Sequence, residues 1–337
     1  MLEIKLPLSW ASTFGSALLL LSSATTASAD TAVSLGGFLS ASSPTSFTIA
    51  DLQTYASQHA SAVKSVTVGS DTYTGVSLFS YLNSVVATDP KVPKNDILRD
   101  YVVASGSGGS SFTYALGSLS GSGFGNLNDI IAYSDSNGAL SNASIIAADG
   151  ANITNLSSLN IGHVDYSGAG AGGQNTSFVV NGLVSNPTVY SAANLPNTLG
   201  TDNVTIGTNT YNGVSLWNLL LQAGLSTDPA TLANEYVIAT GTDNYQAILS
   251  LEELNPLYGN LNDILAYGLG GGSLGTNGFA RIVLPGDTKA GRFVSNLESL
   301  TVVSSVPLPT SALLMLSGLL GMGFRSLAKN LKSRLTV

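Results

Sequence analysis

The chain of 337 residues contains no cysteine and few charged or histidine side chains. Charged residues make up 9% of it, and its two histidines are His59 and His163. Without a thiolate, the chain has no cysteine nucleophile and no soft sulfur ligand for a metal. The two histidines lie far apart in sequence and suggest no Ser-His-Asp arrangement. We expect both to be ordinary surface or core residues.

Basic side chains are scarcer than acidic ones. Between the two terminal segments described below, seven Lys and Arg residues stand against nineteen Asp and Glu residues, a net charge of about −12. Binding of nucleic acid needs a basic stripe that meets phosphate, so this class of function is excluded. The 37 glycines, with many Ser, Thr and Asn residues, indicate a loop-rich β protein with a polar and sparsely charged surface.

The N-terminus has the pattern of a targeting segment. Lys5 precedes an apolar stretch at 14–21, and the tripeptide Ala-Ser-Ala that ends at Ala29 is the small-x-small pattern of a signal-peptidase site. We therefore expect a signal peptide at 1–29 and an exported mature protein.

The C-terminal segment at 306–337 has three parts: Val-Pro-Leu-Pro, an apolar run at 312–324, and four basic residues. The run of thirteen residues is shorter than the about 20 that span a bilayer, and basic residues after such a run stay cytoplasmic. The segment resembles the PEP-CTERM sorting signals of Gram-negative bacteria, with Val-Pro-Leu-Pro where that family has Val-Pro-Glu-Pro. This resemblance implies an exosortase-type partner and at least transient tethering to the membrane. A plain membrane anchor is the alternative.

One block of sequence occurs twice. The string GNLNDI stands at 125–130 and 259–264, followed each time by Ala-Tyr. Other matching strings keep the same order, and the offset between copies drifts only from 138 to 134 residues. This period is too long for a solenoid and fits a duplicated globular domain. We predict domains at 31–165 and 176–304, joined by a Gly-rich linker at 166–175.

Hydrophobic patterning predicts a mixture of short strands and helices in each copy. Alternating segments predict strands, and apolar residues at helical spacing predict amphipathic helices. The strands are expected at 65–68, 101–104, 203–206 and 236–239, the helices at 76–86 and 214–223, and a strand or short helix headed by aspartate at 129–133 and 263–267.

The second copy contains an ordered series of motifs that the first copy carries more faintly. These motifs stand at 178–187, 190–195, 211–220, 236–245, 250–254, 264–267, 281–286 and 291–294. The series resembles the small molybdopterin-binding domain of sulfite-oxidase-like oxidoreductases over about 175–303. The resemblance implies an α+β fold class, with two tandem domains of this type built from mixed β-sheets and short helices.

The resemblance also implies a cofactor site that these residues do not reproduce. In that family a cysteine after an early strand binds molybdenum, and a following loop helps to hold the pterin. Here the strand at 203–206 turns directly into the next segment without a cysteine, and a carboxylate such as Asp71 is a poor substitute for a thiolate. We expect no cofactor; molybdopterin belongs only to the alternative function, an oxidoreductase or a subunit of one.

Candidate binding residues form one basic cluster in the second copy. Arg281, Lys289 and Arg292 match the family segment that borders the cofactor pocket, and guanidinium groups suit bidentate capture of an anion. A small-anion site is therefore predicted there. The alternative is a solvated loop that pairs with Asp287 or Glu298.

Other notable residues have structural explanations. Asp129 and Asp263 of the repeated string are expected to satisfy backbone groups in turns or helix caps, although they could line a polar site. Phe79 and Trp217 occupy matching helical positions and are expected in the core. The run from 135 to 138 lacks the ligand count of a calcium loop and is expected to be a turn.

The sequence thus predicts a non-catalytic exported protein with a binding or structural role, without catalytic residues or metal ligands. Expected partners are the sorting machinery, the membrane through the C-terminal segment, and extracellular matrix or a small anion. Besides the oxidoreductase, a hydrolase acting on surface polysaccharide was considered, but the sequence places no pair of carboxylates for it.

Overall fold

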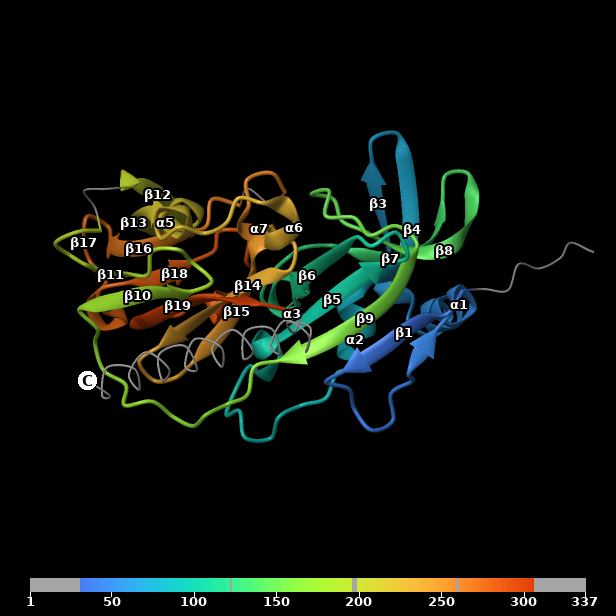
Figure 1. Cartoon of the computed structure of the whole chain (residues 1–337), viewed down its shortest axis with the longest axis horizontal. Helices are drawn as coiled ribbons and strands as arrows, with labels where there is room; N and C mark the ends of the chain where they lie inside the picture. Colours follow the sequence, from blue (N-terminus) through green and yellow to red (C-terminus); the bar gives the residue numbers. More distant parts are fainter. Residues whose placement is uncertain (1–30, 122, 196–198, 259–260, 306–337) are drawn as a thin grey trace, which may run out of the picture.

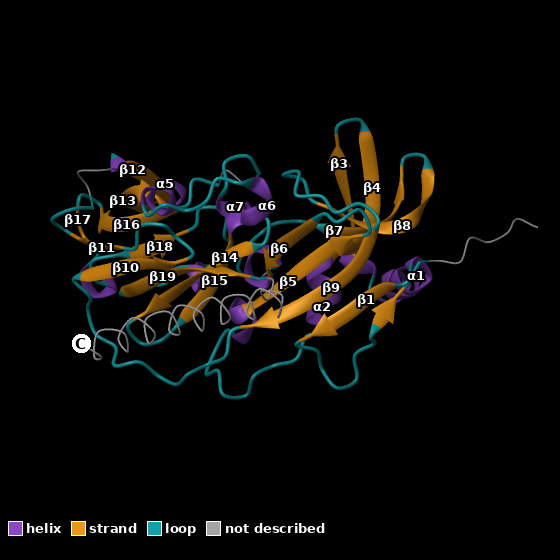
Figure 2. Cartoon of the chain, in the orientation of Figure 1, coloured by secondary structure: helices purple, strands orange, loops and turns teal. Residues whose placement is uncertain are grey.

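The computed structural model describes residues 31–121, 123–195, 199–258 and 261–305. The predicted signal peptide and the C-terminal segment at 306–337 lie outside these residues. Within the described ranges, no helix has the length and apolar character needed to cross a membrane. The fold is mixed α and β, with four sheets and a few short helices, in agreement with the predicted fold class (Figures 1 and 2).

The first repeat contains a five-stranded and a four-stranded sheet. Its strands are β1 (Val33–Gly37), β2 (Ser46–Phe47), β3 (Val63–Val68), β4 (Asp71–Ser77), β5 (Asp100–Gly106), β6 (Ser111–Ala115), β7 (Ile130–Asp135), β8 (Gly138–Ile146) and β9 (Leu156–His163). The five-stranded sheet has the order β2-β1-β9-β5-β6, in which β1 and β9 run parallel. The four-stranded sheet has the order β3-β4-β7-β8 and is antiparallel.

The second repeat has the same arrangement. Its strands are β10 (Ser177–Gly182), β11 (Thr188–Ser191), β12 (Asp202–Ile206), β13 (Asn209–Ser215), β14 (Glu235–Gly241), β15 (Gln246–Ser250), β16 (Ile264–Leu269), β17 (Gly272–Ser273), β18 (Arg281–Val283) and β19 (Leu297–Ser304). One sheet has the order β11-β10-β19-β14-β15, again with one parallel pair, β10 and β19. The other has the order β12-β13-β16-β17, and β18 also pairs with β16.

Short helices connect these strands. They are α1 (Ile49–Gln58), α2 (Leu78–Asn83), α3 (Leu116–Leu119), α5 (Leu216–Gln222), α6 (Pro229–Leu232) and α7 (Leu251–Leu254), with 3₁₀ helices η1 (Ala60–Ala62), η2 (Asp96–Arg99), η3 (Gly275–Asn277) and η4 (Ala290–Arg292). The helices predicted at 76–86 and 214–223 begin two residues later than expected. Ser77 and Ser215 still end strands, and each serine hydroxyl accepts a backbone N–H of the following helix as its N-cap.

Glycine recurs at one register shift in each repeat. The shift lies next to Gly75 in β4 and next to Gly213 in β13. A Cβ on Gly75 would come within 2.2 Å of the carbonyl oxygen of Ile131, and one on Gly213 within 2.4 Å of that of Leu265. The repeated glycine is therefore required because the neighbouring strand approaches its backbone closely.

The two repeats contact each other through equivalent elements, so each contact made by an element of one repeat has a counterpart made by the other. The edge strands β6 and β15 lie against each other, α7 packs on β6, and α3 packs on β15. At this interface the rings of Tyr101 and Tyr236, the second residues of β5 and β14, lie 4.4 Å apart. Such reciprocity is the mark of an approximate two-fold relation between the repeats.

Hydrogen bonds across the interface follow the same relation. Arg99, directly before β5, donates to Oε1 of Gln246 at 2.6 Å. The equivalent residue before β14 is Asn234, whose Oδ1 accepts from the hydroxyl of Ser111 at 2.5 Å. Gln246 and Ser111 are the first residues of β15 and β6. The positions are thus equivalent, but the side chains differ.

The Gly-rich segment predicted as a linker at 166–175 has no regular secondary structure. The backbone N–H groups of Gly170 and Gly172 donate to the carbonyl oxygens of Asp243 and Thr242. The segment therefore lies along the second repeat. The domain boundaries drawn from sequence stay a prediction.

Candidate functional site

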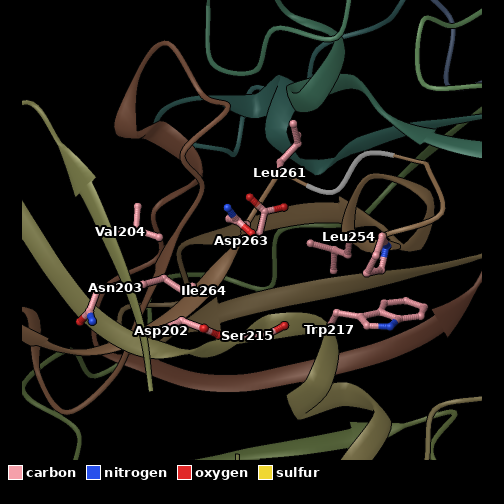
Figure 3. A pocket seen from close by; sticks show the side chains of 11 residues that line it. Asp202, Asn203, Val204, Ser215, Trp217, Leu254, Leu261, Asp263 and Ile264 are labelled. Atoms are coloured by element: carbon pink, nitrogen blue, oxygen red, sulfur yellow. The ribbon is translucent and has the colours of Figure 1, made fainter. Parts of the chain in front are cut away.

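A pocket of about 140 Å³ lies in the second repeat, where strands β12, β13 and β16 meet the start of α5 (Figure 3). Its polar lining and its aromatic wall come from different parts of the chain. The main groups are Asp202, Asn203, Ser215, Trp217, Asn262 and Asp263. The volume leaves room for several water molecules or a small ligand.

Trp217 forms the aromatic wall of this pocket. It is the second residue of α5, and the Ser215 cap fixes where that helix starts. Figure 3 shows the indole on one side of the pocket and Asn203 on the other. The ring is half-buried and packs against the core of the repeat. The prediction of a core position was therefore incomplete, because the residue also faces a cavity.

Asp263 supplies a buried carboxyl group to the pocket. Its main-chain oxygen accepts the N–H of Leu216 at 2.9 Å, and its Oδ1 has no hydrogen-bond partner. Burial raises the pKa of Asp263 well above its usual value; the nearby charge of Glu253 acts in the same direction, and Arg292 opposes it. Burial therefore favours the protonated form of this carboxyl.

A pocket of about 310 Å³ occupies the equivalent place in the first repeat. In the register of β3 and β4, Lys64 lies opposite Gly75. In the register of β12 and β13, Asp202 lies opposite the equivalent Gly213. Lys64 and Asp202 are therefore equivalent lining residues. The other matched lining residues, first repeat before second, are Ser77 and Ser215, Phe79 and Trp217, Leu127 and Leu261, and Asn128 and Asn262. The same cavity is therefore built twice, with opposite charge at one position.

The repeated string GNLNDI contributes to both pockets. It provides Asn128 to one and Asn262 to the other, and the main-chain oxygen of each following aspartate accepts the first N–H of α2 or α5. The main chain makes this contact, and any residue type would supply it, so it does not account for the aspartate side chains of Asp129 and Asp263. The two copies of the string are not identical in conformation, since Asn262 has a φ of 57° and Asn128 is not among the positive-φ residues.

The predicted anion-binding residues do not converge on an open site. Arg292 is 2% exposed; it donates to both oxygens of Glu253 at 2.8 Å and, through Nε at 3.0 Å and Nη2, to Asp287. Lys289 is exposed, and the guanidinium of Arg281 lies over the ring of Phe293. An anion at Arg292 would have to displace a buried carboxylate. Pairing with Asp287, the alternative from sequence, is present, but inside the protein rather than in solvent.

A second buried acidic group spans the two repeats. Glu252 of α7 interacts with Asp149 and Asp129 of the first repeat, and Glu252 and Asp129 are each 3% exposed. Burial, followed by the neighbouring carboxyls, raises the pKa of Glu252 well above its usual value. Burial and Asp149 do the same for Asp129. The buried surroundings therefore favour the protonated form of both carboxyls.

The absence of a molybdopterin cofactor stays a prediction from the sequence. Strands β12 and β13 are joined only by Gly207 and Thr208, and β3 and β4 only by Gly69 and Ser70. Both hairpins are tight, and the chain has no cysteine that could bind molybdenum.

Comparisons with known proteins give one partial likeness in structure. No family model and no curated protein matches the chain. Among solved structures, the sulfane dehydrogenase SoxCD from Paracoccus pantotrophus is similar, with 21% sequence identity and a TM-score of 0.32. The match covers 40% of this chain and 39% of that chain, so the chain spans well under half of its length. At this level of likeness nothing about activity follows for this chain.

Proposed function

We propose that the protein is an exported, non-catalytic binding protein whose two repeats each hold a small ligand in the pocket beside the GNLNDI string. The observation that supports this proposal is the recurrence of the pocket at equivalent positions with matched lining residues. Export and tethering rest on the sequence patterns at 1–29 and 306–337.

The lining of the second pocket favours a neutral ligand with an apolar face and hydroxyl groups, such as a sugar ring. The indole of Trp217 offers a flat apolar surface, and aromatic faces bind such surfaces well. The amides of Asn203 and Asn262 offer both donors and acceptors, and the carboxyl of Asp263 adds further hydrogen-bonding atoms. A few polar groups around an apolar wall are typical of small-molecule sites.

The charge difference between the pockets predicts different preferences. Lys64 at the first pocket favours a sugar that carries a carboxylate, whereas Asp202 at the second favours a neutral or amino sugar. Both residues are exposed, so each charge contributes mainly to selectivity rather than to affinity.

Hydrolysis of a glycoside is the second candidate function, because Asp202 and Asp263 line the same pocket. One is exposed and the other is buried with a raised pKa, and glycosidases use such a pair of carboxyls in unlike environments. The first pocket has Lys64 in place of Asp202 and would lack this activity. Release of reducing ends from oligosaccharides, abolished by Asp202→Asn, would favour hydrolysis over binding.

Trp217 gives a direct assay of the proposed function. It is the only tryptophan outside the predicted signal peptide, so intrinsic emission reports on this pocket. A panel of neutral, amino and acidic sugars and short oligosaccharides would be titrated against the mature chain. We expect saturable quenching or a blue shift with at least one neutral or amino sugar.

Calorimetry on variants separates the pocket from other surfaces. Trp217→Ala is expected to weaken binding of that sugar roughly tenfold, as the loss of an aromatic contact predicts. Phe79→Ala, the matched change in the first repeat, should leave the Trp217 titration unchanged. The proposal fails if no sugar alters the emission of Trp217, or if Trp217→Ala binds as tightly as the unaltered chain.

A further inference from the structure

Three metal-ligating side chains meet at one end of the five-stranded sheet of the first repeat. Asp100 begins β5, His163 ends β9, and these two residues face each other in the antiparallel register. Asp96 is the first residue of the adjacent helix η2. One ligand atom from each of the three lies within 4.8 Å of the others.

Each of these side chains has a buried atom without a hydrogen-bond partner. These atoms are Oδ1 of Asp96, Oδ2 of Asp100 and Nε2 of His163. Asp100 is fully buried, and the side chain of His163 is 5% exposed. Unsatisfied polar atoms in the interior are unfavourable, so the free oxygens of the two carboxylates call for a partner.

The neighbouring side chains fix the position of the His163 ring but leave its Nε2 atom without a hydrogen-bond partner. Nδ1 of His163 is hydrogen-bonded to Oδ1 of Asp100 at 2.6 Å, and the ring of Phe38 stacks on the imidazole at 4.2 Å. Nε2 faces Oδ2 of Asp89 at 3.8 Å. The two ring nitrogens point in opposite directions, so Nδ1 would bind an ion shared with Asp100 in place of their hydrogen bond. Asp89 would then lie at the other nitrogen, as a carboxylate often does at metal sites.

The nearest buried cation does not neutralise the group by contact. The guanidinium of Arg99 donates to the main-chain oxygens of Val164, Asp165 and Asn244 and to the side chain of Gln246. All its hydrogen bonds in the described structure therefore go to neutral acceptors. Asp89, Asp96 and Asp100 keep an excess of negative charge that a divalent ion would balance.

We infer that Asp96, Asp100 and Nδ1 of His163 bind one divalent first-row transition-metal ion. Carboxylates with a single imidazole suit ions such as Zn²⁺ and Mn²⁺ and do not suit soft ions that need sulfur. Zinc–ligand bonds of about 2.0–2.2 Å place opposite ligands at most roughly 4.4 Å apart. Small side-chain rotations therefore close the present group around an ion.

The second repeat provides an internal control. The residues that correspond in register to Asp100 and His163 are Glu235 and Ser304. A serine hydroxyl in place of the imidazole leaves no nitrogen ligand there. The inference is therefore one ion per chain, bound by the first repeat alone.

The test is a titration of the metal-free mature chain with Zn²⁺ and, separately, with Mn²⁺, followed by calorimetry and by thermal unfolding. We expect one equivalent to bind and to raise the unfolding temperature. Asp96 is half-buried, and the side-chain oxygen of an asparagine at this position can still accept the N–H of Asp89. The Asp96→Asn variant should therefore fold. It is expected to bind at least tenfold more weakly, as is His163→Gln.

Glu235→Gln is the matched control and should bind the ion as the unaltered chain does. Co²⁺ substitution adds a spectroscopic readout, since d–d absorption reports a nitrogen and oxygen ligand set. The inference is overturned if neither ion binds with a stoichiometry of one. It is also overturned if Asp96→Asn and His163→Gln both bind with unchanged affinity.

Discussion

Arg292→Met leaves two buried carboxylates without the cation that pairs with them. The side chains of Glu253 and Asp287 are each 1% exposed, so water cannot replace the lost guanidinium as their hydrogen-bond donor. Removing one partner of a buried ion pair costs about 3–5 kcal/mol, because the charge left behind stays desolvated. Methionine keeps the length and apolar stem of the side chain, so the loss of stability reports the removal of the charge rather than a loss of packing.

The loss is expected to depend on pH. Burial already raises the pKa of Glu253 and of Asp287, with Arg292 acting against it. Without Arg292 both pKa values rise further in the folded state, so the fold binds protons that the unfolded chain has released. The stability of the variant should therefore increase as pH falls from 8 toward 5. The deficit of about 3–5 kcal/mol applies at the alkaline end and shrinks on acidification.

Urea unfolding, followed by Trp217 emission and by far-ultraviolet circular dichroism, measures this deficit. Lys289→Met is the matched control: it removes a neighbouring but exposed cation and should change stability by less than about 0.5 kcal/mol. The reasoning is refuted if Arg292→Met costs less than about 1 kcal/mol at pH 8. It is equally refuted if the deficit is the same at pH 5 and pH 8.

Four further outcomes are expected. Glu252→Gln should cost less stability than Glu253→Gln, because burial favours the uncharged form of Glu252 whereas Glu253 pairs with Arg292; equal losses in urea unfolding would contradict this. Burial raises the pKa of Glu235 to about 7, so its protonated form favours the fold below about pH 4.5 and this contribution is lost as pH rises through 7. In the Glu235→Gln variant, stability should fall less as the pH rises. Identical dependence of the melting temperature on pH in the variant and the unaltered chain would argue against this. Gly213→Ala should lower the melting temperature, because its Cβ meets a carbonyl oxygen at 2.4 Å; an unchanged temperature would count against the close approach. Intact mass of the surface form should lack the residues after about 310 if the segment at 306–337 is a sorting signal, and a full-length mass would leave the plain anchor.

Local patterns in the sequence predicted the elements that depend on near neighbours. The strands at 101–104 and 236–239 are present in β5 and β14, and the segments after Asp129 and Asp263 are strands rather than short helices. The two helices begin later than predicted because Val76 and Val214 fit a helical pattern but belong to strands. There the serine cap, rather than apolar spacing, sets the boundary.

The candidate sites depend on contacts between distant residues, which spacing alone does not reveal. Asp202 joins Asp263 in one pocket through strand pairing, and Asp100 meets His163 across 63 positions through the β5–β9 register. The histidine was therefore expected to be ordinary. The signal in the sequence for the two pockets was the exact recurrence of GNLNDI, since residues of this string line both of them. The polar residues of the string also suit turns and helix caps, and this interpretation was preferred.

The reciprocal interface makes the chain equivalent to a homodimer whose subunits have been fused. In a true homodimer every substitution appears at both places at once, whereas here each half has changed by itself: Arg99 against Asn234, and Lys64 against Asp202. The peptide link also replaces a concentration-dependent association with an intramolecular one at high effective concentration. The contact between the two halves therefore does not depend on the concentration of the protein.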